Sequence, residues 1–370
     1  MLINEFHLQA RDLGLLSGGY FFGFGLMQLP NGDWIDKYGP RKIILVLMAI
    51  AFLGCLAFSF SSNFIYLLAS RTLIGVGVSA CLMAPLTAFR KWYSKEEFQR
   101  CYSLMLMAGS TGILASTLPV QWLLTIVGWR KVSLVIAILV LLSFLLVLVF
   151  IPNWKNIHEK KYEKMNIIES YLPVLKDSYF KSIILIGFFN YGGFLAVQTL
   201  WAAPWLIKVS GYTEIQTAVG LFWLNLAMLL TYLLASFINP YISKKGIGDE
   251  KLINYGLPLS FFTLLITIIF AQSSGWVHWT LFCIFSIVST FAQIGIMLHF
   301  PNTIYGKASS AFNLTVFLGV FAIQWGIGLI IDLLKFLKFS EVASYQGAFS
   351  VFLICLIGSY LYFQKHKIKI

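Results

Sequence analysis

The stretch Gly32-Asp33-Trp34-Ile35-Asp36-Lys37-Tyr38-Gly39-Pro40-Arg41-Lys42 is a short, charged connection between two long apolar runs, residues 13–31 and 43–61. A membrane-crossing helix needs roughly 20 mainly apolar residues, and each run is about that long. A charged turn between two such runs predicts a helical hairpin in a membrane, because the turn can stay in water while the runs lie in lipid.

The composition extends this prediction to the whole chain. Apolar residues make up 59% of the 370 positions and charged residues only 11%, whereas a soluble globular domain has about 25% charged residues. So few charges cannot cover the surface of a soluble protein of this size, but a surface in contact with lipid is apolar. We therefore expect an all-α, polytopic membrane protein that lies in the lipid bilayer.

Eleven apolar runs are long enough to cross a membrane. They predict helices rather than barrel strands, because barrel strands are about 10 residues long and alternate in polarity. The runs are residues 13–31, 43–61, 64–85, 103–126, 132–151, 183–206, 214–238, 252–271, 277–299, 309–333 and 345–363.

Lysine and arginine are unevenly distributed between the two sets of helix ends. One set carries Lys37, Arg41, Lys42, Arg90, Lys91, Lys95, Arg100, Lys155, Lys160, Lys161, Lys164, Lys176, Lys181, Lys244, Lys245, Lys251, Lys307, Lys365, Lys367 and Lys369. The other set carries Arg11, Arg130, Lys131, Lys208, Lys335 and Lys338. Cytoplasmic loops accumulate Lys and Arg, so we expect the first set and the C-terminus to be cytoplasmic. The net charge of +12 follows from the same bias and does not indicate a nucleic-acid partner.

The longest connection, residues 152–182, divides the chain into two parts. It is basic and partly amphipathic, which fits either a plain solvated linker or a short helix on the membrane surface. We expect an N-terminal bundle of five helices in residues 1–151, a cytoplasmic linker, and a C-terminal bundle of six helices in residues 183–370.

The residues of the 32–42 loop have clear local uses. Gly32 lets a neighbouring helix approach closely, and Gly39 permits a tight turn. Asp36 lies at a helix end, where a carboxylate can pair with a basic residue or face a helix N-terminus. Arg41 and Lys42 would anchor the loop at the cytoplasmic face.

The same stretch resembles the loop signature of the major facilitator superfamily, GxxxD(R/K)xG(R/K)(R/K)(R/K), with Pro40 at one basic position. The resemblance implies a two-bundle fold, secondary transport, and a role for this loop in holding the bundles together at the cytoplasmic face. A generic basic turn is the alternative. The latch residues that the resemblance implies are Gly32, Asp36, Lys37, Gly39, Arg41 and Lys42.

A shift of 207 residues finds a degenerate copy of the loop at residues 239–246, after the second helix of the back part. In the family the signature follows the second helix of the first bundle, whereas in this chain it follows the first. The resemblance therefore implies that the front bundle lacks its first helix, through a truncation or a misassigned start, and that the native protein has twelve helices.

Arg71 is the charge placed well inside an apolar run. A charge there costs roughly 2.5–3.5 kcal/mol on insertion scales and is a functional candidate by default. The run Arg71-Thr72-Leu73-Ile74-Gly75-Val76-Gly77 also resembles the RxxxGxG pattern of the fourth family helix, which implies proton coupling or helix pairing for Arg71 and Gly75. The alternative is that Arg71 reaches the outer membrane surface with its long side chain.

A central pathway needs polar groups at mid-helix depth. In the run Asn190-Tyr191-Gly192-Gly193 two glycines would loosen a helix, while Asn and Tyr offer hydrogen bonds. Each polar residue could instead be a helix–helix contact. The pathway residues that we predict as a group are Asn190, Tyr191, Gln198 and Gln324.

The sequence favours a carrier over an enzyme. It has no Walker, HExxH, GxSxG or CxxC motif, and its five cysteines and five histidines are scattered, so we expect no cofactor and no metal. We expect a monomeric secondary transporter of the bacterial inner membrane that moves a small polar organic solute by alternating access, coupled to protons or another ion. Arg71 favours an anionic or zwitterionic solute. Alternatives are a uniporter, a drug or metabolite exporter, a solute sensor without flux, and a membrane enzyme acting on lipids.

Overall fold

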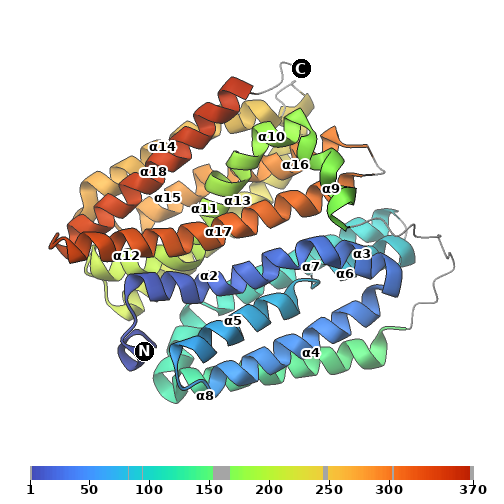
Figure 1. Cartoon of the computed structure of the whole chain (residues 1–370), viewed down its shortest axis with the longest axis horizontal. Helices are drawn as coiled ribbons and strands as arrows, with labels where there is room; N and C mark the ends of the chain where they lie inside the picture. Colours follow the sequence, from blue (N-terminus) through green and yellow to red (C-terminus); the bar gives the residue numbers. More distant parts are fainter. Residues whose placement is uncertain are drawn as a thin grey trace.

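The computed structural model describes residues 2–81, 83–93, 95–152, 167–244, 249–301 and 304–366, and this part of the chain is helical without strands. The helices run roughly side by side (Figure 1). Nine helices in the described residues are long and apolar enough to cross a membrane. The prediction of an all-α polytopic membrane fold is thus confirmed.

The helices up to residue 150 form what we call the first half of the molecule. They are α1 (Leu2–Phe6), α2 (Ala10–Leu26), α3 (Gln28–Tyr38), α4 (Pro40–Ser59), α5 (Phe64–Val78), α6 (Met83–Trp92), α7 (Lys95–Ala115) and α8 (Leu118–Phe150).

The helices from residue 178 onward form the second half. Its first pass is a chain of short pieces: α10 (Ser178–Leu185), the π-helix η1 (Ile186–Tyr191), α11 (Gly192–Ala196), the π-helix η2 (Val197–Trp201) and α12 (Ala202–Lys208). The other passes are α13 (Glu214–Lys244), α14 (Asp249–Phe270) with η3 (Ala271–Ser273), α15 (Trp276–Ser286) with η4 (Ile287–Thr290) and α16 (Phe291–His299), α17 (Tyr305–Phe336) and α18 (Glu341–His366).

Three expected spans are interrupted: 64–85 is divided into α5 and α6, and prolines explain the interruptions in the other two. Proline has no N–H for the carbonyl four residues earlier, and its ring clashes with that carbonyl. Pro30 stands four residues after Leu26, where α2 ends, and Pro119 stands four residues after Ala115, where α7 ends. The expected spans 13–31 and 103–126 are therefore α2 with α3, and α7 with the first part of α8.

Helix α8 contains the turn that separates the last two expected spans of the first half. Gly128 has φ +76° and ψ 165°, a conformation that is essentially restricted to glycine. The chain changes direction there, so residues 118–127 belong to one pass and residues 129–150 to the next.

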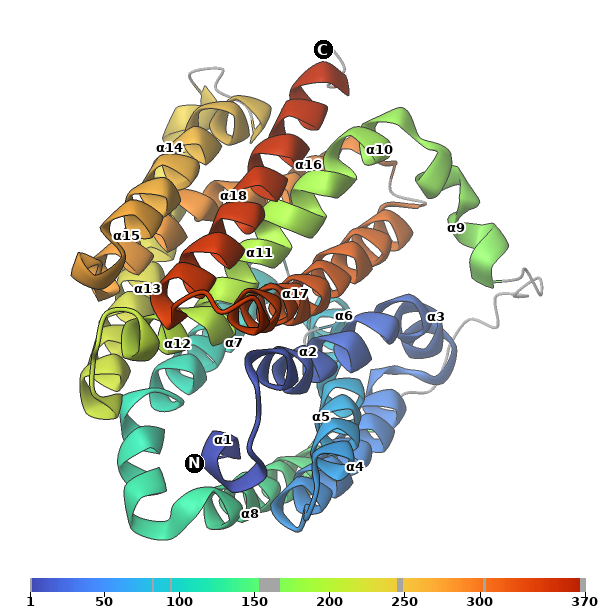
Figure 2. The same cartoon turned by 60° about the vertical axis from the view of Figure 1, so that its left-hand side comes forward.

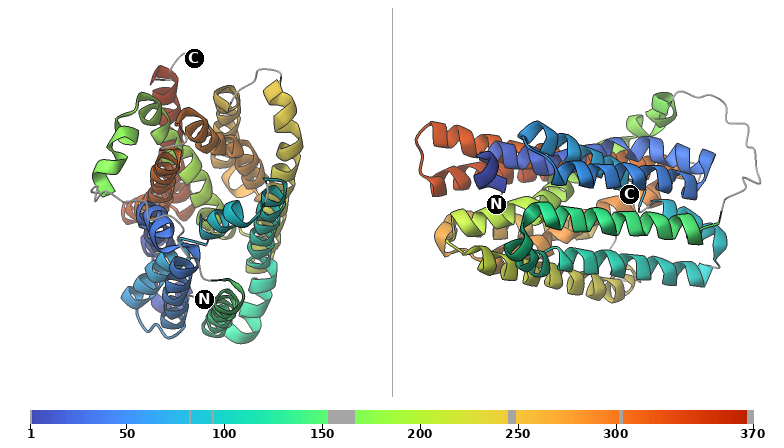
Figure 3. Two further views of the ribbon diagram at one scale, coloured as in Figure 1. Left: turned by 90° about the vertical axis from the view of Figure 1, so that its right-hand side faces the viewer. Right: turned by 90° about the horizontal axis from the view of Figure 1, so that it is seen from below.

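The two halves lie on opposite sides of a boundary. First-half helices, blue to teal, and second-half helices, green to red, form separate groups in Figure 1 and in the left panel of Figure 3. Helix α1 lies at one end of the bundle and α9 (Ile167–Lys176), the described helix of the linker, at the other. We call these the α1 face and the linker face.

Helices α2 and α17 join the halves as an antiparallel pair (Figure 2). A Cβ atom at Gly14 would meet the backbone of Gln324, and one at Gly328 would meet the backbone of Ala10. Gly18 of α2 packs against Phe321 of α17. Glycines on both helices thus allow the backbones to approach closely, as small residues do in membrane helix pairs.

The buried core lies mostly in the second half. Its fully buried side chains include Trp201, Trp205, Trp279 and Phe349. The rings of Trp205, Trp279 and Phe349 contact one another edge to face or tilted. By contrast, α8 of the first half exposes much of its apolar surface; Phe150 is 73% exposed. Exposed apolar surface of this extent fits contact with lipid.

Candidate functional site

The 32–42 stretch is mostly helical, because residues 32–38 belong to α3 and residues 40–42 to α4; the predicted tight turn is confined to Gly39. Gly39 has φ +83° and ψ 152°, so a side chain at this position would be strained. Pro40, which departs from the family pattern, is the first residue of α4, where its missing N–H costs nothing. A Cβ atom at Gly32 would lie 4.0 Å from Ser310 Oγ, so α3 passes close to α17 of the second half.

The basic residues of this loop lie in the first half. Arg41 Nη2 donates to the carbonyl oxygen of Leu148 at 2.7 Å, and a cation is favourable near the C-terminal end of a helix such as α8. Lys37 Nζ lies 5.0 Å from the centre of the Tyr38 ring, and Lys42 is exposed. The Asp36 side chain lies outside the described residues, as do residues 245–248 at the end of the degenerate copy.

At the linker face, a hydrogen bond between the halves comes from the linker helix α9. The Tyr171 hydroxyl donates to the carbonyl oxygen of Leu29 in α3 at 3.3 Å, and it also bonds to Ser310 of α17. Burial, together with the nearby Asp33 carboxylate, raises the pKa of Tyr171 to about 12. Sequence reasoning missed this residue, because the amphipathic pattern of the linker predicted either a solvated linker or a short helix on the membrane surface.

Arg71 lies among first-half helices. Its guanidinium group is 5.1 Å from the centre of the Phe58 ring of α4, with Tyr20 of α2 and Cys55 of α4 nearby. Its Nε atom is buried and has no hydrogen-bond partner among the described residues. Gly75, one turn further along α5, packs directly against the backbone of Tyr20 and so pairs α5 with α2.

The four predicted pathway residues divide into two groups. Asn190 is 3% exposed, and its Nδ2 donates to Ser359 Oγ of α18 at 2.7 Å. It is therefore a helix–helix contact inside the second half. Tyr191 is half-buried, and its ring stacks on Phe194 with 6.5 Å between centroids.

Gln198 and Gln324 belong to one polar neighbourhood around the π-helix η2. Gln198 Nε2 donates to Asn225 Oδ1 of α13 at 3.0 Å, and Gln324 Nε2 donates to Thr199 Oγ1 at 3.0 Å. The indole of Trp201 donates to the Gln324 carbonyl oxygen at 3.1 Å. This network, in which sequence reasoning missed Thr199, connects α13, α17 and the first pass of the second half.

The first pass of the second half leaves α-helical geometry on both sides of Gly192 and Gly193. Gly192 packs against the backbone of α17 at Val316 and Val320, and Gly193 against the ring of Phe352. The glycines thus serve close packing, while η1 and η2 provide the irregular backbone. Single π-helical turns within α-helices are frequent at functional sites.

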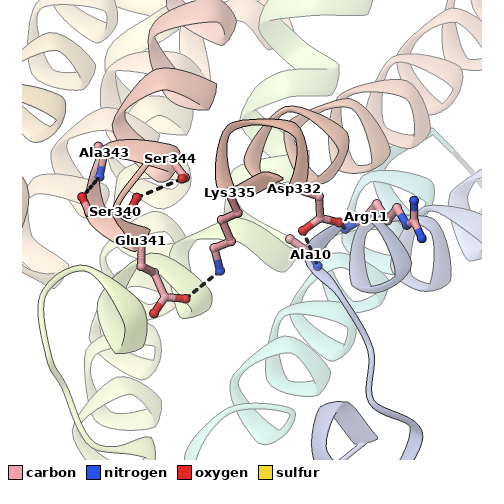
Figure 4. A network of polar contacts seen from close by, with 8 residues as sticks. All are labelled: Ala10, Arg11, Asp332, Lys335, Ser340, Glu341, Ala343 and Ser344. Carbon is pink, nitrogen blue, oxygen red and sulfur yellow. Dashed lines mark hydrogen bonds and ion pairs between the residues drawn. The ribbon is translucent and has the colours of Figure 1, made fainter. Parts of the chain in front are cut away.

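At the α1 face, polar contacts join the halves at two places. Asp332 of α17 accepts hydrogen bonds from the backbone N–H groups of Ala10 and Arg11 at the start of α2 (Figure 4). Gln121 Nε2 of α8 donates to Glu214 Oε2 of α13 at 3.3 Å. The role of Asp332 was not predicted, because nothing in its surrounding sequence shows which helix terminus lies opposite.

The short helix α1 is held at the same face by a charged group. Glu5 accepts a hydrogen bond from the Trp129 indole at 2.7 Å and pairs with Arg130 at 2.6 Å. These two contacts hold the pKa of the Glu5 carboxyl below its usual value. In the described part of the chain, no three His, Cys, Asp or Glu side chains gather as metal ligands would.

Residues 1–324 match the family model of the Major Facilitator Superfamily, and the chain belongs to that family. The match includes the 32–42 stretch, the first half, and the second half as far as residue 324 within α17, so it confirms the resemblance inferred from the sequence.

Three relatives illustrate the range of the family. The chain is 24% identical over 284 residues to the uncharacterized transporter YybO of Bacillus subtilis, covering 70% of this chain and 65% of the relative. It is 24% identical to the glucose transporter GlcP of Staphylococcus epidermidis, covering 94% and 84%. It is 23% identical over 136 residues to the probable sulfoacetate transporter SauU of Cupriavidus necator, covering 37% and 32%.

The fold is also that of solved transporters. A bacterial homolog of the human lysosomal transporter Spinster, in an inward-facing and occupied conformation, superimposes with a TM-score of 0.75 at 16% identity. The superposition covers 99% of this chain and 90% of that structure. The relatives are named as transporters, which agrees with the prediction of a carrier rather than an enzyme.

Proposed function

We propose that this protein is a secondary active transporter that moves a small polar organic solute across the membrane by alternating access. The observation that carries the proposal is the partly buried group of polar contacts around η2, in which Gln198 pairs with the buried Asn225 and the buried Gln324 pairs with Thr199. Polar groups at membrane depth are costly and tend to mark substrate pathways. Transporters built from internal structural repeats bind substrate between their halves, near the middle of the membrane. Gln324 lies on α17, a second-half helix that packs against α2 of the first half.

The proposed solute is anionic or zwitterionic. Arg71 supplies a positive charge inside the first half, and the charge partners resolved near it are weak acids, Tyr20 and Cys55. An uncompensated charge at this depth favours a negative group nearby. The relative SauU, named as a sulfoacetate transporter, fits this solute class, whereas GlcP is named for a sugar.

We propose that the linker face is cytoplasmic and that transport is coupled to protons or another ion. The orientation rests on the excess of Lys and Arg at the helix ends of that face. The latch role of the 32–42 loop belongs to the same proposal, with Gly32 and Tyr171 as the described residues at the crossing of α3, α9 and α17.

The test is uptake into proteoliposomes by the purified protein. One set of vesicles receives labelled small sulfonates and carboxylates and another receives labelled sugars, each with and without an imposed proton gradient. We expect gradient-dependent uptake of an organic anion that a protonophore abolishes. Uptake of sugars alone would overturn the solute class, and uptake insensitive to every ion gradient would overturn the coupling.

Two variants distinguish a residue of the substrate pathway from a residue that only packs two helices together. Gln198→Leu should raise the solute concentration needed for half-maximal uptake, whereas Asn190→Ala, which breaks the contact with Ser359, should lower thermal stability and leave that concentration unchanged. A ligand at 100 times its dissociation constant stabilises a protein by about 2.7 kcal/mol. A solute that shifts the melting temperature in this way without being transported would identify a sensor instead of a carrier.

A further inference from the structure

The α1 face has a contact between the halves that differs in kind from the apolar packing around it. Asp332 Oδ1 lies 3.2 Å from the backbone nitrogen of Ala10, and Asp332 Oδ2 lies 2.8 Å from that of Arg11. Both oxygens of one second-half carboxylate are thus hydrogen-bonded to the first turn of a first-half helix. Figure 4 shows Asp332 directed toward this turn from α17.

The chemistry of this contact is favourable. The first N–H groups of a helix have no partner within the helix, and the helix dipole places partial positive charge at the same point. Within the same turn the N-cap residue is engaged differently, because Asp12 accepts a hydrogen bond from the backbone N–H of Gln9 at 3.0 Å. The carboxylate of Asp332 therefore satisfies amide groups that the local sequence leaves open.

The basic side chains near Asp332 are paired with other carboxylates. Lys335, one turn further along α17, pairs with Glu341 at the start of α18 at 2.8 Å, and this ion pair lies entirely within the second half. The Arg11 side chain lies 3.8 Å from Asp12 and extends away from Asp332 (Figure 4). The contact between the halves consequently uses the backbone of α2 and not a basic side chain.

The second contact between the halves at this face is weaker. Gln121 Nε2 lies 3.3 Å from Glu214 Oε2, and Glu214 is exposed. A single hydrogen bond from a neutral amide to an exposed carboxylate stabilises the contact between the halves less than a carboxylate that accepts two backbone hydrogen bonds. The α2–α17 pair therefore carries the stronger polar connection at the α1 face.

We propose that Asp332 is the positioning residue that holds the α1 face of the transporter closed. In this proposal, which rests on the proposed alternating-access function, opening of that face requires Asp332 to leave the first turn of α2. The free energy of this contact then sets the ratio of molecules closed and open at the α1 face. The close packing at Gly14 and Gly328 sets how α2 and α17 lie against each other, whereas the Asp332 carboxylate determines how readily the two helices separate.

The experiment measures the distance between the halves directly. Spin labels are attached to Ser62→Cys in the α4–α5 connection and Gln272→Cys in η3, two exposed positions at the α1 face, after the five native cysteines are replaced. Double electron–electron resonance in lipid nanodiscs gives the populations of short and long distances. This readout needs no substrate.

We expect Asp332→Asn to raise the ratio of long-distance to short-distance molecules by about tenfold, because hydrogen bonds to a charged group are worth roughly that factor or more. Asp332→Glu should restore much of the short-distance population, because it keeps the carboxylate. Glu341→Gln is the matched control: it removes an ion pair at the same face within one half, so the distances should not change.

The outcomes separate this proposal from the function on which it rests. Identical distance distributions for the wild-type protein and Asp332→Asn, in protein that catalyses uptake, would overturn the role of Asp332 and leave transport standing. Equal shifts in Asp332→Asn and Glu341→Gln would show a general loosening of the face and would also overturn it. A wild-type protein without uptake would instead overturn the proposed function.

Discussion

At the scale of single residues, Arg71 is a half-buried cation within an apolar helix, and its guanidinium group lies 5.1 Å from the centre of the Phe58 ring. An aromatic face stabilises a guanidinium group by about 0.5–2 kcal/mol, which is less than the roughly 2.5–3.5 kcal/mol that a charge costs at the centre of a membrane helix. The aromatic contact alone therefore does not offset this cost, which supports the transport role proposed for Arg71.

Replacement of Arg71 tests that role. Arg71→Met should leave the melting temperature unchanged or raise it, because a desolvated charge is replaced by an apolar side chain of similar length, and it should reduce organic-anion uptake at least about tenfold. Arg71→Lys keeps the charge but not the planar donor fork, so we expect intermediate uptake. Normal uptake by Arg71→Met would remove Arg71 from the transport mechanism.

Glu5 is the residue whose pKa gives a pH prediction. Its hydrogen bond from Trp129 and its ion pair with Arg130 lower the pKa of the carboxyl. Docking of α1 is then stabilised at pH values above the ordinary carboxyl pKa, and this stabilisation is lost as the pH falls through the lowered pKa.

Trp129 fluorescence can report the docking of α1. We expect a change in emission on acidification below the ordinary carboxyl range, and we expect Glu5→Gln to abolish that change because no charge remains to be titrated. Superimposable acid titrations of the two proteins would show that Glu5 does not control the docking.

At the scale of elements, special residues decide where helices end. Pro30 and Pro119 terminate α2 and α7 through a missing N–H and a steric clash, and Gly128 permits the change of direction inside α8. These are local effects, so they follow from the chain itself. By contrast, the partner of each helix depends on which of its faces turns inward.

Two glycine-to-alanine variants test whether the backbone conformation at Gly128 requires glycine. Gly128→Ala should destabilise the protein by about 1–3 kcal/mol, because alanine would be forced into a conformation that is essentially restricted to glycine. Gly112→Ala in α7 should be neutral or stabilise by up to about 1 kcal/mol, because glycine is a poor helix former and no atom lies within 4 Å of the added Cβ. Thermal unfolding in detergent measures both, and equal melting temperatures would contradict the assigned role of Gly128.

At the scale of the whole molecule, polar contacts join the halves at both ends of the α2–α17 pair. Asp332 holds the α1 face, and Tyr171 connects the linker helix α9 to α3 and α17 at the linker face. In an alternating-access cycle the two faces open in turn. We therefore expect weakening of either contact to favour the state in which its own face is open and the other face is closed.

Tyr171→Phe tests this opposition. Loss of the hydroxyl removes the hydrogen bond to Leu29, worth about 0.5–1.5 kcal/mol, so opening of the linker face should become easier by roughly that amount. In the spin-label measurement the α1 face should then be more often closed, the reverse of the Asp332→Asn effect. A shift toward the open α1 face would contradict the proposed opposition of the two contacts.

The all-α fold, the long apolar segments, the tight turn at Gly39 and the family were predictable from the sequence. Each depends on the length and polarity of continuous segments or on a local motif, and a segment carries that information by itself. The uneven distribution of Lys and Arg likewise predicted an orientation, which stays a prediction.

Only the tertiary structure decided which polar residues meet. A membrane helix that is apolar on most sides gives no periodic signal for its rotation about its own axis, so the sequence could not distinguish Asn190, which packs against α18, from Gln198, which joins the network around η2. The partners of Asp332 and Tyr171 could not be predicted from the sequence either, because both residues contact residues far away in the chain. Local chemistry determined the elements of this protein, and the packing of its two halves determined the contacts proposed to hold each face closed.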